Sequence, residues 1–223
     1  MDEFRDLGDG YGLLVEGSQY YTGVFAFQLS RRDGKQAMSR LGRMADFLFV
    51  LRDHGSGQVS IDDAGEAVHT YALTDERDVA AYRKGLRVMA KLHEAAGAEE
   101  LWFGATPRVW KRGEDLDAWC DELDAMHIGA GGLFIGSAHQ MGSARMGTDP
   151  ATSVARPTGE LHDVDGVWIG DTSAFPTASG ANPMLTCMAL AHRTAEIIGG
   201  SRDEAPAVLK PMADAALDDA PAA

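Results

Sequence analysis

The sequence predicts an α+β protein in which an antiparallel sheet is covered by helices on one face. Strand-like and helical segments follow one another between residues 11 and 135 in an order that fits such a layered domain. A short strand, a loop and a long helix come next, between residues 167 and 198, as they do in an open α/β sheet. The 223 residues are enough for one large or two small domains, and 45% hydrophobic content with 24% charged residues is ordinary for a globular protein.

The first elements are a strand and a helix. Residues 11–29 carry strand-like apolar positions punctuated by Gly17 and Gly23. Residues 36–52 predict a helix, because their apolar side chains recur at helical spacing. These apolar side chains are Met38, Leu41, Met44, Ala45, Leu48 and Leu51. Such a face could line a pocket for a lipid-like ligand, although it is more often simply core.

The middle of the chain predicts a hairpin and a long helix. Strands at residues 58–61 and 67–73 flank an Asp-Asp-Ala-Gly turn at residues 62–65. The helix then runs from Thr74, its expected N-cap, to Ala96, and Gly97 closes it. Its predicted buried face consists of Leu86, Val88, Met89 and Leu92.

The next segments lead toward the C-terminal third. A strand is expected at residues 100–103, and a short helix at residues 116–126 should turn Trp119 and Leu123 inward. Residues 131–135 then lead into a strand that delivers His139.

The last elements are a buried strand and a buried helix. Val167-Trp168-Ile169 is an apolar run bounded by turn residues, and Asp171 follows at its carboxyl end. Asn182 is the expected N-cap of an almost wholly buried helix at residues 183–198, which Gly199-Gly200 ends. From residue 201 the chain is rich in Ala, Asp and Pro and is predicted to be disordered.

Residues 136–186 have an unusual amino-acid composition. Single polar residues stand among Gly, Ala, Ser and Pro, namely His139, Arg145, Asp171 and Asn182. Small residues let the backbone approach a large flat ligand, and isolated polar groups between them can orient it. The segment therefore predicts the lining of a cofactor site.

Four motifs in this segment resemble the C-terminal signature of the glucose-methanol-choline (GMC) flavoprotein oxidoreductases. They are His139–Gly147 (HQMGSARMG), Asp149-Pro150 with Ser153-Val154, Gly170–Pro176 (GDTSAFP) and Asn182–Thr186 (NPMLT). Within that family the His-Gln-Met-Gly wording is most similar to long-chain alcohol oxidases and related bacterial alcohol dehydrogenases. The resemblance implies oxidation of a primary or secondary alcohol, with FAD as the cofactor.

The resemblance also implies roles for individual residues. His139 matches the histidine that accepts the hydroxyl proton while hydride moves to flavin N5, and Asn182 matches the partner that hydrogen-bonds the substrate oxygen. Asp171 and Thr172 match positions near the ribityl and pyrophosphate part of FAD. The backbone of Asn182, Pro183 and Met184 would lie at the pyrimidine side of the flavin, where a helix N-terminus stabilises negative charge.

Each of these residues has a structural alternative. A lone His in a Gly-rich stretch is usually a satisfied core residue, Asp171 could be a turn residue and Asn182 only a helix cap. Arg145 is expected to satisfy carbonyls or a carboxylate rather than touch substrate. The other histidines have no motif around them and are expected to be structural or solvated; they are His54, His69, His93, His127, His162 and His192.

A dinucleotide-binding turn is missing from the sequence. No G-x-G-x-x-G follows a predicted strand, so half of the FAD site is expected to lie elsewhere. We therefore expect residues 1–134 to be part of a substrate domain and residues 135–200 to be the catalytic, FAD-contacting segment of a Rossmann-like α/β domain whose N-terminal part is absent. Residues 201–223 form the tail. The chain could be a gene fragment, a truncated form, or a subunit that needs a separate FAD-binding half.

Charge and composition exclude several classes. The net charge of −14 argues against nucleic-acid binding and against anionic membrane surfaces. No apolar run is long enough for a transmembrane helix, and the acidic N-terminus is unlike a signal peptide. Cys120 and Cys187 have no metal-ligand spacing, so we expect a cytoplasmic protein without a metal.

Two other function classes are weighed against alcohol oxidation. A hydrolase is disfavoured, because the sequence has no G-x-S-x-G, no HExxH and no paired-Cys zinc pattern. A non-catalytic fragment or interaction subunit is the stronger rival, because the dinucleotide turn is missing.

Overall fold

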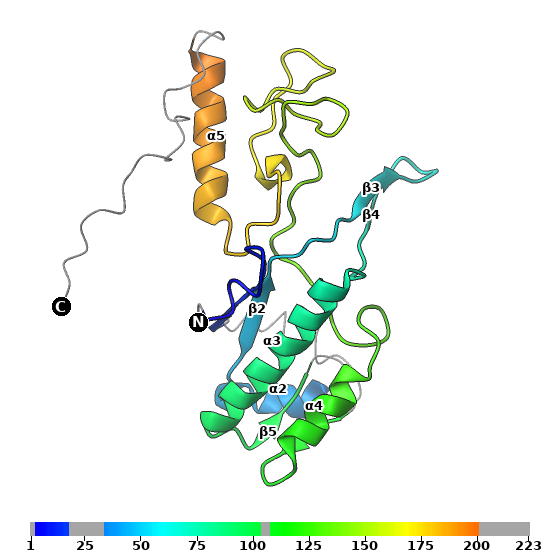
Figure 1. Ribbon diagram of the computed structural model, residues 1–223, viewed down its shortest axis with the longest axis vertical. Helices are drawn as coiled ribbons and strands as arrows, with labels where there is room; N and C mark the ends of the chain where they lie inside the picture. The colour runs from blue at the N-terminus through cyan, green and yellow to red at the C-terminus, as the bar shows by residue number, and fades with distance from the viewer. Residues whose placement is uncertain (1–2, 18–33, 104–107, 201–223) are drawn as a thin grey trace, which may run out of the picture. The chain divides into compact units, whose positions relative to one another are not determined.

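The computed structural model describes residues 3–17, 34–103 and 108–200 of the chain. It divides the chain into two compact units. Unit 1 comprises Met1–His139 and Ala178–Asn182, and unit 2 comprises Gln140–Thr177 and Pro183–Ala223. Helices and small antiparallel sheets make up the described elements, so the mixed α/β class with antiparallel pairing is confirmed (Figure 1).

Unit 1 begins with an antiparallel strand pair. Strand β1 (Leu13–Gly17) pairs with β2 (Phe47–Leu51), with Val15 opposite Phe49 and Glu16 opposite Leu48. Side chains alternate along a strand, so Leu13 and Val15 are buried at 1% and 3% exposure, whereas Leu14 and Glu16 are half-buried. The rest of the predicted strand at residues 18–29 lies outside the described residues.

The predicted helix at residues 36–52 is wrong over its second half. Helix α2 covers only Gly34–Ser39, a 3₁₀ turn covers Leu41–Arg43, and Met44 is already extended with φ −95° and ψ 146°. The sequence Phe-Leu-Phe-Val-Leu of β2 has two aromatic residues and one β-branched residue, types that are enriched in strands. Antiparallel pairing with β1 makes these residues a strand instead of a helix. The spacing of apolar side chains in the sequence does not reveal that pairing.

The predicted hairpin is confirmed. Strand β3 (Gln58–Ile61) pairs with β4 (Ala67–Thr70) in an antiparallel register. The side chain of Asp62 closes the turn by accepting hydrogen bonds from the backbone N–H of Ala64 and of Glu66, both at 2.9 Å. Gly65 has φ +85°, a left-handed conformation that Gly adopts without steric cost.

The two long helices of unit 1 are close to their predicted bounds. Helix α3 spans Glu76–Ala95, and its N-cap is Asp75 rather than the predicted Thr74, because the Asp75 carboxylate accepts from the N–H of Arg77. Helix α4 spans Leu116–Asp124. The strand expected at residues 100–103 shortens to β5 (Glu100–Leu101), which pairs with β6 (Trp110–Lys111).

The core of unit 1 lies between α3, α4 and the β1–β2 pair. The predicted inward residues Trp119 and Leu123 are 3% and 2% exposed, and they pack with Trp110 and with Tyr82 and Leu86 of α3. Arg87 of α3 binds Asp121 and Asp124 of α4. In Figure 1 these two helices lie beside each other (teal and green), and α3 also contacts both β1 and β2.

Unit 2 consists of loops joined by isolated bridges, and of helix α5 (Met184–Gly199). The predicted strand at residues 167–169 is wrong: only Trp168 forms a bridge, to Glu160, and Val167 is 44% exposed. In unit 1, the predicted strand leading to His139 is also absent, and residues 131–139 hold only the bridge of Leu133 to Ile128. A buried parallel strand needs neighbours on both sides, and among the described residues the segment 167–169 pairs only with residues 159–161, in an antiparallel bridge.

Helix α5 ends as predicted at Gly199-Gly200, but its burial was predicted wrongly. Thr194 and Ile197 are buried, whereas a run of large apolar side chains is open to solvent (orange helix in Figure 1). The exposed fractions are 66% for Met184, 74% for Leu185, 61% for Met188 and 53% for Ile198. No helix among the described residues is both long and apolar enough to cross a lipid bilayer.

Candidate active site

The residues predicted to form the site are divided between the two units. His139 and Asn182 belong to unit 1, whereas Asp171, Thr172, Pro183 and Met184 belong to unit 2. Each group has a local framework of its own, built from hydrogen bonds that join segments far apart in the sequence.

In unit 2, two of the sequence motifs form one hydrogen-bonded structure. The backbone N–H groups of Gly142, Ala144 and Met146 donate to the carbonyls of residues 172, 173 and 174, at 2.9–3.1 Å. The hydroxyl of Thr172 adds a bond to the Gln140 carbonyl at 2.8 Å. The residues that follow His139 are therefore held beside the residues that follow Asp171.

Asp171 acts as a turn residue in unit 2. It is the N-cap of a 3₁₀ turn at Thr172–Ala174, and its Oδ1 accepts from the backbone N–H of Ser173 at 2.8 Å and from the Ser173 hydroxyl. The residue is exposed, so the carboxylate lies at the surface of unit 2.

Asn182 is not the predicted helix cap. Pro183 is the N-cap of α5, with no side-chain cap hydrogen bond, and Asn182 instead donates from Nδ2 to the Glu16 carboxylate at 2.9 Å. The preceding loop packs closely against Arg52, the residue directly after β2. A Cβ added to Gly180 would lie only 3.0 Å from the Arg52 side chain. Unit 1 therefore holds the residues immediately before α5.

His139 is half-buried in an irregular segment of unit 1. Its backbone N–H donates to the Ser137 hydroxyl at 2.9 Å. A local side-chain bond of this kind takes the place of the predicted strand.

The N-terminus of α5 presents backbone donors without a side-chain cap. The first N–H groups of any helix have no intrahelical acceptor, and they carry partial positive charge. Pro183 is buried, whereas Met184 is 66% exposed at this end. This end of the helix can therefore stabilise an anionic group.

Two further side chains support the motif loop. Arg145 donates from Nε to the Thr152 carbonyl at 2.7 Å, so it satisfies a carbonyl as predicted. His162 lies with Nε2 at 3.0 Å from the Ser153 hydroxyl and at 3.1 Å from the Gly147 carbonyl. Its predicted structural role is confirmed.

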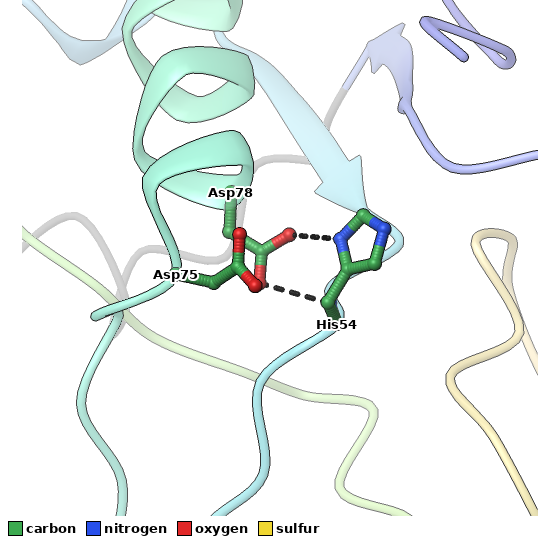
Figure 2. A group of neighbouring side chains, drawn as sticks. All are labelled: His54, Asp75 and Asp78. Atoms are coloured by element: carbon green, nitrogen blue, oxygen red, sulfur yellow. Dashed lines mark hydrogen bonds and ion pairs between the residues drawn. The ribbon is translucent and has the colours of Figure 1, made fainter. Parts of the chain in front are cut away.

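A second cluster of polar residues, which sequence reasoning missed, lies in unit 1 around His54. The imidazole Nδ1 is 2.7 Å from Asp78 Oδ1, and the other Asp78 oxygen accepts from the His54 N–H (Figure 2). That second oxygen also accepts from the N–H of Gly55. Asp78 is 1% exposed, and its hydrogen bond raises the pKa of His54. Tyr11 stacks on the imidazole with ring centroids 3.7 Å apart. An Asp at the third position of a helix gave no signal of this partnership.

Most polar atoms of this cluster are already used by hydrogen bonds, whereas His54 Nε2 has only the Asp9 carboxylate nearby, at 3.5 Å. Asp75 caps α3 and binds the Arg77 guanidinium, which holds the Asp75 pKa below its usual range. Next to the cluster lies a cavity of about 450 Å³, lined also by Arg52 and Lys84. Although His54, Asp75 and Asp78 lie close enough to bind one ion, the nearby Arg77 opposes a cation. We assign the cluster a structural role.

Comparisons with known proteins agree with the family that the motifs indicate. The family model described as GMC oxidoreductase matches residues 53–191. The chain is 34% identical over 191 residues to long-chain-alcohol oxidase FAO4A of Arabidopsis thaliana, covering 82% of this chain and 26% of that protein. It is 33% identical to FAO3 of the same plant, covering 80% of this chain and 25% of that protein. The chain thus spans about a quarter of the length of these relatives.

One solved structure is also similar. It is the crystal structure of pyridoxine 4-oxidase from Mesorbium loti, with a TM-score of 0.49 and 22% sequence identity. The similarity covers 68% of this chain and 29% of that chain.

Proposed function

The chain belongs to the GMC oxidoreductase family, and we propose that it forms the C-terminal catalytic part of an FAD-dependent enzyme that oxidises a primary or secondary alcohol. The substrate would be a small-molecule alcohol, and long-chain alcohols are the first class to test, because two relatives are long-chain-alcohol oxidases.

The observation that carries this proposal is the hydrogen-bonded framework of unit 2. It joins residues 140–146 to residues 172–174, so the segments that flank His139 and Asp171 form one structure. Three backbone bonds and the Thr172 hydroxyl hold a stretch that is otherwise poor in regular elements. Catalytic groups need such fixed supports, because small displacements cost large factors in rate.

In this proposal His139 is the base. A hydroxyl group is a poor hydride donor until its proton leaves, and imidazole titrates near neutral pH, so a placed histidine contributes about 10²–10⁴-fold. An amide has no comparable basicity. Asn182 would therefore position the substrate oxygen and leave proton removal to His139.

The residues present fit a flavin. The uncapped N-terminus of α5 suits an anionic ring edge, and Gly142, with φ +80°, lets the backbone approach a flat ligand. Asp171 and Thr172 lie on one 3₁₀ turn and would contact the ribityl and pyrophosphate part. FAD, when bound, supplies the hydride acceptor that no side chain can replace. The backbone of Asn182, Pro183 and Met184 would border the ring.

We further propose a functional role for each of three segments of the chain. Residues 1–134 would contribute to the substrate domain, residues 135–200 would carry the catalytic and FAD-contacting groups, and residues 201–223 would be a tail. A separate FAD-binding half would cover the apolar face of α5, where Leu185 and Met188 are 74% and 61% exposed.

The test measures flavin reduction by alcohol. The chain is produced together with an FAD-binding half, loaded with FAD, and mixed anaerobically with aliphatic alcohols while the flavin absorbance is followed. We expect bleaching in the wild type, and a loss of about 10²-fold or more in His139→Ala with unchanged flavin content. Wild-type reduction rates in His139→Ala would contradict the proposal.

The rival function has a separate signature in the same experiment. A non-catalytic interaction subunit would bind its partner and leave flavin reduction unaffected by both His139→Ala and Asn182→Ala. Loss of reduction in both variants, with flavin still bound, supports catalysis and excludes that rival.

A further inference from the structure

We propose that Glu16 is a positioning residue that holds the Asn182 amide with one N–H directed at the substrate oxygen. The inference rests on the proposed function, because it assigns Asn182 its donor role in the same site. The two residues are 166 positions apart in the sequence, and Glu16 lies in no motif.

The hydrogen bond determines which way the Asn182 amide faces. An ionised carboxylate accepts hydrogen bonds and donates none, so the nitrogen of the amide must face Glu16. Nδ2 lies 2.9 Å from Glu16 Oε2, in agreement with this orientation. One N–H is then used by Glu16, and the second N–H of the same nitrogen is left to donate.

The partner side chain stands on a rigid support. Glu16 is the fourth residue of β1, directly after Val15, which is 3% exposed in the core, and it lies opposite Leu48 of β2. The strand alternation therefore directs Glu16 to the face opposite the buried Leu13 and Val15. The core of unit 1 sets where the carboxylate lies.

The loop that carries Asn182 is also held in place. The Ser179 hydroxyl donates to the Ala181 carbonyl at 2.6 Å and so closes a small turn. Gly180 has φ +65° and lies against Arg52, the residue directly after β2. Residues 178–182 thus contact Glu16 near the end of β1 and Arg52 after the end of β2. The hydrogen bond to Glu16 fixes the Asn182 side chain at the end of this segment.

This arrangement suits the chemistry of alcohol oxidation. Negative charge grows on the alcohol oxygen as its proton leaves, and a fixed N–H donor stabilises that charge without having to reorient. A freely rotating amide would present its oxygen part of the time, and an oxygen would repel the charge. Glu16 suppresses that orientation.

The first experiment tests the contact in the chain itself, without a cofactor. Asn182 is the only asparagine in the sequence, so labelling with ¹⁵N-asparagine yields one side-chain NH₂ group in an NMR spectrum. We expect Glu16→Ala to shift one of its two proton signals and to speed its exchange with water. The exposed hairpin variant Glu66→Gln is the matched control and should leave both signals in place. Unchanged signals in Glu16→Ala would overturn the contact.

The second experiment tests the role in the FAD-loaded enzyme. We expect Glu16→Ala to lower kcat about tenfold or more at constant flavin content, because the donor loses its fixed direction. Glu16→Gln should restore a large part of the rate, since its amide oxygen can still accept from Asn182. A wild-type kcat in Glu16→Ala would overturn the role of Glu16.

The two proposals fail in different ways. Wild-type flavin reduction in His139→Ala contradicts the proposed function. Loss of reduction in His139→Ala, together with no effect of Glu16→Ala, contradicts the role of Glu16 and leaves the proposed function standing. The NMR result does not depend on either rate.

Discussion

The carboxylate of Asp78 and the imidazole of His54 form a 2.7 Å hydrogen bond that ties the first turn of α3 to the segment after β2. The same carboxylate accepts from the N–H groups of His54 and Gly55 at 2.8 and 3.0 Å, so one buried side chain satisfies three donors. Asp78 thereby sets the path of the chain between β2 and β3.

Asp78→Ala should strongly destabilise unit 1. The substitution leaves two backbone donors and an imidazole without their acceptor in a buried position, and breaking such a buried pair costs about 3 kcal/mol or more. Urea unfolding followed by circular dichroism measures the loss. Asp117→Ala is the control, because Asp117 is 66% exposed and its ion pair with Lys91 is worth little. Equal losses in the two variants would contradict the prediction.

Stability should depend on pH through His54. Its pKa is raised in the folded state above the ordinary 6.5 by the hydrogen bond to Asp78, while burial and Arg77 oppose the rise. A raised folded pKa stabilises the fold fully below the unfolded pKa, and this contribution is lost as pH rises through the folded pKa.

The His54 contribution is obtained as a difference. Asp78, Asp75, Asp9, Arg77 and Tyr11 all surround the imidazole. The unfolding free energy of the wild type minus that of His54→Gln should therefore be largest below pH 6.5 and shrink toward alkaline pH. A difference that grows with pH would show the opposite shift. The half-buried His93, whose pKa is lowered by desolvation, cancels in this subtraction.

Gly85→Ala should destabilise the contact between α3 and β2. A Cβ at this position would lie 2.9 Å from Cδ1 of Phe49. Overpacking lowers the free energy of unfolding by about 1–3 kcal/mol, and the better helix propensity of Ala offsets up to about 1 kcal/mol of this loss. We therefore expect the free energy of unfolding to fall by about 1 kcal/mol. Thermal unfolding measures it. Adding Phe49→Leu should recover part of the loss, and a more stable Gly85→Ala variant would contradict the clash.

Asp171→Ala should weaken FAD retention. The side chain caps the 3₁₀ turn and, in the proposed function, lies near the ribityl and pyrophosphate part. We expect the dissociation constant for FAD to rise about tenfold, the size of one lost hydrogen bond. Ser173→Ala removes the hydroxyl that bonds Asp171 and serves as the control. If both variants retain flavin equally well, Asp171 is only a cap.

The exposed face of α5 should govern assembly with the FAD-binding half. Replacing Leu185 and Met188 together with Gln removes apolar surface that lies three positions apart on one side of the helix. Co-purification should drop while the melting temperature of the chain alone stays the same. Ile61→Gln, which changes a residue 75% exposed on the β3–β4 hairpin, should not affect it. Unchanged co-purification in the double variant would contradict this role for α5.

The sequence by itself determined the elements whose signals are local. The hairpin turn at Asp62 to Gly65, the end of α3 before Gly97, the inward residues of α4 and the Gly199-Gly200 end of α5 follow from turn chemistry, capping and helical spacing. The GMC motifs also depend only on residue order, and the family match confirms the family that they indicate.

Only the tertiary structure decided the features that depend on distant partners. Residues 47–51 fit a helix or a strand by pattern, and pairing with β1 selects the strand. Val167–Ile169 is apolar enough for a buried strand but finds no sheet among the described residues. Asn182 is hydrogen-bonded to Glu16, and His54 to Asp78, because the chain folds back on itself. Contacts between residues so far apart in the sequence produce no periodic pattern from which they could be predicted.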